Sequence, residues 1–142
     1  MIAGDVAVRD WVNAQTQTLT GQGKPLSGAF LHEQASPQSG AYCVIYQLQG
    51  SSDLVAEQDS SLATVSLVFL VYSMTQQASS VAAAALASAI EQLTGNPVPC
   101  GPAGADITIL ASDNLRGPVF APAPAEEFAY QVTADFLLLA QP

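Results

Sequence analysis

The sequence is poor in charge, and above all in positive charge. Only 11% of its residues are charged, against the ~25% usual in soluble domains. Three are basic (Arg9, Lys24 and Arg116) and twelve are acidic, for a net charge of −9. A protein that grips nucleic acid or an anionic membrane needs several cations to neutralise phosphates. The sequence therefore argues against both kinds of partner.

Residues that build metal centres and nucleophilic active sites are also scarce. The chain has two cysteines, Cys43 and Cys100, without a CxxC motif, and one histidine, His32. We expect both thiols to be free, and we expect no metal and no cofactor. No sequence signature surrounds a serine or cysteine nucleophile, and no glycine-rich loop has the pattern of a phosphate site. The sequence therefore does not predict an enzyme.

Acidic side chains gather at two places, residues 53–59 and Glu126–Glu127. Both lie in stretches rich in serine or proline, where neighbouring carboxylates are usually solvated. The first also lacks the glycine and the terminal glutamate of a calcium-binding EF-hand loop. We therefore expect neither group to be a general acid–base pair.

One long stretch, from Ser60 to Ile90, contains no charged side chain. A membrane helix needs ~20 consecutive apolar residues, whereas this stretch is interrupted by the polar segment 75–80. Its first half is rich in β-branched and aromatic residues and its second half in alanine. We expect a strand, a turn capped by Thr75 or Ser79, and a helix of a soluble subunit. The N-terminus also lacks the pattern of a secretory signal.

The periodicity of the whole chain predicts helices and strands in alternation. The expected helices span 4–20 and 80–93, and the expected strands span 26–33, 41–49, 62–74, 106–112 and 128–140. The segments 95–105 and 113–127 are predicted to be irregular. This order predicts an α+β fold in a single domain, 1–142, with a mostly antiparallel sheet packed against an N-terminal helix and a central alanine-rich helix.

Two expectations concern burial. The strand at 62–74 is mainly apolar on both faces, so we expect it to be central and covered on both sides. Trp11 is expected in the core. The second helix is expected to bury a stripe of six residues, with Ile90 at its margin: Val81, Ala82, Ala85, Leu86, Ala89 and Leu93.

This arrangement resembles the tail terminator proteins of long-tailed bacteriophages, also called tail completion or tail-to-head joining proteins. The likeness is one of order and pattern over nearly the whole chain, and no short motif is diagnostic by itself. It rests on a helix, a strand, an acidic loop, a second strand, a helix of small residues and a last strand. The matching segments are "AVRDWVNAQTQTL", "AYCVIYQLQG", "SLVFLVYSM", "SSVAAAALASAIEQLTG" and "EEFAYQVTADFLLLA".

The resemblance implies a structural virion protein without an active site, located at the head-proximal end of the phage tail and assembled in the host cytoplasm. Family members form a ring, typically a homohexamer, that binds the last ring of tail tube protein and ends tube polymerisation. The other face of the ring meets the head–tail connector or neck protein. DNA passes through without specific binding, and the net charge of −9 suggests an acidic lumen that repels it.

Candidate contact segments for the tube or the neck are 51–59, 95–105 and 112–126, which we choose for their length and expected exposure. The candidate interface residues are Asp53, Leu54, Val55, Glu57, Asp59, Arg116, Glu126 and Glu127. These segments are equally compatible with plain connectors. Two other functions stay open: another phage neck, connector or minor tail component, and a soluble ligand-binding domain or small enzyme.

Overall fold

The computed structural model describes residues 4–14, 19–20, 25–31, 41–47, 61–93, 98–100, 106–123 and 127–141. The predicted α+β fold is confirmed. The elements in chain order are α1 (Gly4–Ala14), β1 (Ala29–Leu31), β2 (Tyr42–Gln47), β3 (Ser61–Ser73), α2 (Gln76–Glu91), β4 (Val98–Cys100), β5 (Asp106–Ala121) and β6 (Phe128–Gln141).

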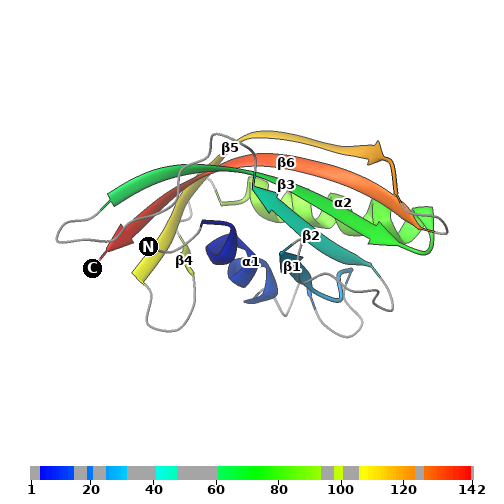
Figure 1. Ribbon diagram of the computed structural model, residues 1–142, viewed down its shortest axis with the longest axis horizontal. Helices are drawn as coiled ribbons and strands as arrows, with labels where there is room; N and C mark the ends of the chain where they lie inside the picture. The colour runs from blue at the N-terminus through cyan, green and yellow to red at the C-terminus, as the bar shows by residue number, and fades with distance from the viewer. Residues whose placement is uncertain are drawn as a thin grey trace.

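The described strands form one six-stranded sheet in the order β1-β2-β3-β6-β5-β4. Only β1 and β2 pair in parallel, and every other neighbouring pair is antiparallel, as the sequence predicts. The long central pair joins β3 to β6 over their whole shared length, from Ser61 opposite Ala140 to Ser73 opposite Phe128. Figure 1 shows this pair and β5 as the arch of the molecule.

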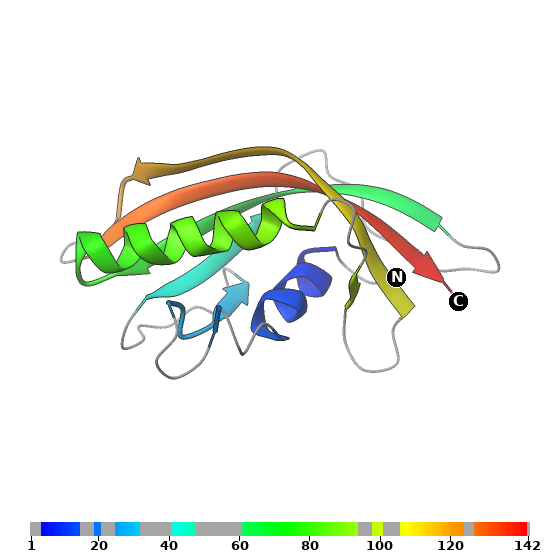
Figure 2. The same cartoon turned by 180° about the vertical axis from the view of Figure 1, so that it is seen from behind.

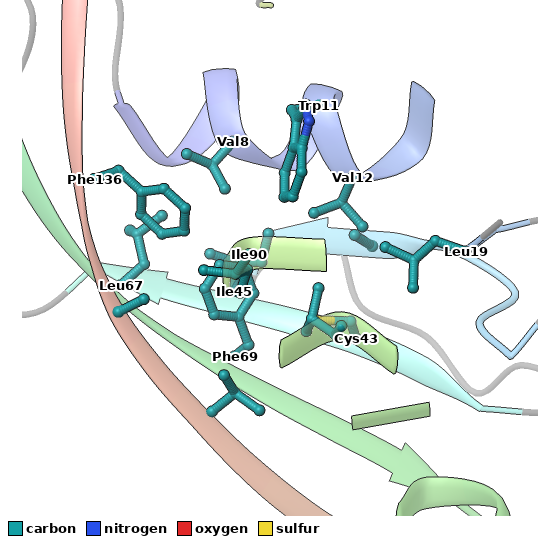
Figure 3. Close-up of a cluster of buried hydrophobic side chains, with 14 of the residues drawn as sticks. Val8, Trp11, Val12, Leu19, Cys43, Ile45, Leu67, Phe69, Ile90 and Phe136 are labelled. Atoms are coloured by element: carbon teal, nitrogen blue, oxygen red, sulfur yellow. The ribbon is translucent and has the colours of Figure 1, made fainter. Parts of the chain in front are cut away.

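Both helices lie on the inner side of the arched sheet, as Figure 2 shows from behind. Helix α2 packs against β3, β5 and β6, and α1 packs mainly against β1, with smaller contacts to β2, β3 and β4. Figure 3 shows Trp11 and Val12 of α1 directed towards the side chains of β2 and β3, among them Ile45 and Phe69. Trp11 is 4% exposed, which confirms its place in the core.

The expectation that β3 is covered on both faces is wrong for one of them. Val65, Leu67, Phe69 and Val71 are fully buried under the helices. The residues between them, from Ser66 to Tyr72, are only half-buried, because among the described residues no helix covers that side. Antiparallel sheets commonly leave one face to solvent, but such a face is normally polar. The apolar residues here therefore need another explanation.

Helix α2 begins earlier than predicted and is rotated relative to the predicted stripe. Thr75 is the N-cap, and its side chain accepts a hydrogen bond from the Ala78 N–H at 3.2 Å. Val81 is 54% exposed, so its expected burial is wrong. The buried side is Ser79, Ala82, Ala83, Leu86, Ala87 and Ile90. Because alanine occurs on every side of this helix, several of its faces are equally suited to burial. Contact with β5 and β6 determines which face is buried.

Helix α1 is shorter than the predicted 4–20. It ends at Ala14, and Leu19 and Thr20 form a turn and a bridge to Leu26. The Thr20 hydroxyl donates to the Asn13 carbonyl at 3.3 Å. The expected helical position of Leu19 is wrong, although the side chain is buried as expected.

Two predicted irregular segments contain strands. β4 (Val98–Cys100) lies within 95–105, and β5 continues through most of 113–127, as far as Ala121. Register shifts lie between Ile109 and Ala111, between Asp113 and Arg116, and between Arg116 and Val119. Each shift breaks the period-two alternation that identifies a strand in a sequence. The continuation of β5 is therefore hidden from pattern analysis.

Candidate interaction surface

The side of the sheet turned away from both helices is called the open face. Residues directly opposite one another on paired strands point to the same face, so the register defines its members. From β2, β3, β6 and β5 they include Tyr42, Val44, Tyr46, Ser66, Val68, Leu70, Tyr72, Gln131, Thr133, Asp135, Leu137, Asp113, Arg116 and Val119. The face mixes aromatic, aliphatic and hydroxyl side chains with few charges. That composition is typical of protein–protein interfaces.

Three tyrosines and a glutamate, the tyrosine cluster, occupy one end of the open face. Tyr42 and Tyr72 are cross-strand partners whose stacked rings have centroids 5.5 Å apart. The Tyr42 hydroxyl donates to Glu127 Oε2 at 2.9 Å. The side chain of Tyr72 is hydrogen-bonded to Tyr46, which is 36% exposed. The cluster therefore joins β2, β3 and the residue preceding β6 in one polar–aromatic network.

The environment of the cluster favours the protonated hydroxyls of Tyr42 and Tyr72. Burial first, and then the hydrogen bond to Glu127 and its negative charge, raise the pKa of Tyr42 to about 12. Burial and the neighbouring Tyr46 also raise the pKa of Tyr72. Tyr42 therefore remains a hydrogen-bond donor to Glu127 throughout the neutral pH range.

We predict that the free energy of unfolding falls as the pH rises from 10 through about 12. An unfolded tyrosine loses its proton near pH 10, whereas folded Tyr42 retains it until about pH 12. Tyr42→Phe should remove this part of the pH dependence in denaturant titrations. Glu127→Gln should lower the pKa of Tyr42 and leave it above the ordinary value, because burial is the larger cause. An unchanged alkaline profile in Tyr42→Phe would contradict the assignment.

A second polar group lies nearer the middle of the open face. Asp135 accepts a hydrogen bond from Asn114 Nδ2 at 2.8 Å. This bond, a second one from Ser66 and the charge of Arg116 lower the pKa of Asp135. Asn114 has a φ of 53°, a conformation that asparagine tolerates better than most residues. The group holds the irregularity of β5 between Asp113 and Arg116 against β6, with Arg116 near the Asp135 carboxylate.

The outer edge of β5 is a further exposed feature. Among the described residues, β4 pairs with β5 only at Ile107–Ile109, and no strand covers the edge beyond. After the last bulge the register is regular at Val119–Ala121, here called the β5 edge. Val119 is 59% exposed and Phe120 is 56% exposed. Such an apolar edge is a ready template for contact with another chain.

The opposite edge of the sheet, at β1, is partly closed by the protein itself. The side chain of Asn13 in α1 accepts a hydrogen bond from the Ala29 N–H at 2.8 Å and donates to the Ala29 carbonyl at 3.0 Å. The amide thereby replaces a neighbouring strand at this position. The β5 edge is therefore the more accessible of the two.

Gly117 sets the course of the chain into the β5 edge, and we predict that Gly117→Ala is strongly destabilising. Its φ of +95° is rarely adopted by residues with a side chain, and an added Cβ would overlap the Gln131 carbonyl oxygen of β6. We expect a loss of at least about 2 kcal/mol in the free energy of unfolding, measured by urea denaturation with Trp11 fluorescence.

Gly28→Ala is the matched control for Gly117→Ala. Its Cβ would meet only ordinary contacts, the nearest being the Phe30 ring at 3.4 Å. We expect a clearly smaller effect there. Equal losses at the two glycines would contradict the assigned role of Gly117.

Most of the sequence-predicted interface residues lie outside the described residues: Asp53, Leu54, Val55, Glu57, Asp59 and Glu126. Arg116 and Glu127 are described, and both belong to the open-face region, Arg116 near Asp135 and Glu127 bonded to Tyr42. The expectation that Glu127 is merely solvated is wrong. The tyrosines carry no sequence motif that marks them as interface residues, although Tyr42 and Tyr46 occupy alternate positions of one strand and so share a face.

Cys43 is a free thiol, fully buried, and burial raises its pKa far above the ordinary value. Within the described residues, no three histidine, cysteine or acidic side chains gather as metal ligands would. Among the same residues, no helix has the length and apolarity needed to cross a membrane. His32 and the side chain of Cys100 lie outside the description.

These features define an α+β protein whose helices cover one face of a curved, mixed sheet. No family model matches the chain, and no curated protein matches it. The chain is similar to a solved structure of a protein whose name states no function, with 13% sequence identity and a TM-score of 0.46. The alignment covers 99% of this chain and 92% of that one. At this level the likeness supports no conclusion about function.

Proposed function

We propose that the chain is a tail terminator of a long-tailed bacteriophage, a structural subunit that closes into a ring on the tail tube. One observation carries the proposal from the structure. Exposed apolar side chains lie at two separate places on the same subunit: Tyr46 on β2, and Val119 and Phe120 at the β5 edge, with β3 and β6 between them. In a closed ring, one patch of each subunit contacts a different patch of the next subunit, so each subunit needs two unlike contact surfaces.

The charge of the chain suits this role. A ring at the head-proximal end of the tail must let DNA pass, and a subunit with three basic residues and a net charge of −9 offers little to hold phosphates. The same shortage of charge lowers the desolvation cost of burying the subunit between neighbours. The proposed partners are other copies of the chain, the tail tube protein and the neck protein.

Light scattering and negative-stain electron microscopy of the chain, alone and mixed with polymerising tail tube protein, would test the proposal. We expect rings, either free or at tube ends, and tubes whose growth stops when the chain is added. Binding along the tube without termination would instead indicate another neck or minor tail component. A monomer inert towards tube protein would overturn the proposal.

A further inference from the structure

The tyrosine cluster combines two chemistries that attract cations. Tyr46 and Tyr72 present partly exposed aromatic rings on the open face, and the ring faces carry negative electrostatic potential. Glu127 adds a carboxylate at the same end of the sheet, with one of its oxygens held by Tyr42 at 2.9 Å. The hydrogen bond fixes the carboxylate beside the rings.

Among the described residues, no basic side chain is found to pair with the tyrosine cluster. Arg9 pairs with Asp10 at 3.1 Å on α1, the helix on the other side of the sheet. Arg116 acts on Asp135, farther along β6. Since the full sequence holds only three basic residues, a second copy of the chain is a poor source of a free cation.

We propose that the tyrosine cluster binds an arginine side chain of a protein partner, with the guanidinium against Tyr46 and Tyr72 and hydrogen-bonded to Glu127. A planar guanidinium stacks on aromatic rings and matches a carboxylate through two parallel hydrogen bonds, whereas a lysine ammonium does neither. The partner is therefore a protein with an exposed arginine, set among apolar residues that match Val68 and Leu70. This inference holds whether or not the chain closes into a ring.

Nuclear magnetic resonance with an isotope-labelled chain tests the site directly. The probe is a capped Gly-Arg-Gly-Arg-Gly peptide, and its matched control replaces both arginines with citrulline, the neutral isostere. We expect saturable shifts, with a millimolar dissociation constant, in backbone amides of β2, the end of β3 and the start of β6. The citrulline peptide should bind more weakly by roughly fivefold or more, since it lacks the charge.

Variants separate the cluster from general acidic attraction. Glu127→Gln and Tyr46→Leu should each weaken binding by roughly two- to fivefold. Leu137→Ala, on the same face but outside the cluster, should leave binding unchanged. The proposal is overturned if no shifts occur, or if they centre on Asp113 and Asp135 instead of the cluster. It is also overturned if the citrulline peptide, or a peptide with lysine in place of arginine, binds equally well, or if Glu127→Gln binds fully.

Discussion

Replacing Phe69 with alanine is expected to lower the free energy of unfolding by about 3–5 kcal/mol, a large part of the 5–15 kcal/mol typical of a domain. Phe69 is fully buried in β3, and its ring packs edge-to-face against Phe136 of β6 with centroids 5.9 Å apart. The substitution removes that contact and leaves a cavity beneath both helices, where the backbone of the long β3–β6 pair cannot collapse. Urea unfolding followed by Trp11 fluorescence measures the loss.

Phe120→Ala provides the matched control for the core substitution. Phe120 makes a similar edge-to-face contact, with Tyr130 at 5.5 Å, but it is 56% exposed. Removing it leaves no cavity, so we expect a loss of about 1 kcal/mol. If both variants were destabilised equally, the described core would not be the main source of stability.

Much of the fold was predictable because long strands with one buried face have a clear alternation. In β6, Val132, Ala134, Phe136 and Leu138 are fully buried, whereas Gln131 just before them and Leu137 between the last two are exposed. Bulges remove this signal in β5, so alternation does not predict the second half of that strand. In α2 the signal is ambiguous, because alanine permits burial on any side.

The candidate surface was less predictable than the fold. Tyr42 and Tyr72 are thirty residues apart, and only the register of β2 with β3 brings their rings together. Periodicity assigns each tyrosine to a face of its own strand, but it does not say which faces coincide. The apolar second face of β3 indicates coverage by the protein's own helices and a surface covered by another chain equally well.

Low charge and the exposed apolar residues have a common explanation in assembly. Tyr46, Val119 and Leu137 are large exposed hydrophobic side chains on the open face, whereas Phe120, paired with Tyr130, is exposed at the β5 edge on the helix side of the sheet. A subunit that functioned alone would gain nothing from this distribution, and it would risk aggregation through the β5 edge. In a ring the same side chains become interface contacts, which is how the proposed function accounts for them.

Phe120→Asp is therefore expected to abolish ring formation while leaving the subunit folded. The substitution places a negative charge on the β5 edge of an already acidic subunit. It also removes an aromatic side chain, a type that dominates interface energies, and should weaken each subunit contact by on the order of 2 kcal/mol. Because every subunit contact in a ring is identical, the loss recurs at each one. Light scattering, under conditions where the unmodified chain forms rings, should show monomers.

Val81→Asp is the control for that experiment, since Val81 is a hydrophobic residue of nearly the same exposure, 54%, on the outer side of α2. It introduces the same charge away from both the β5 edge and the open face. We expect this variant to retain the proposed ring assembly. If rings persist in Phe120→Asp, the β5 edge is not part of the subunit contact. If rings disappear equally in Val81→Asp, the loss does not depend on the position of the charge, and the β5 edge is again not identified as the contact.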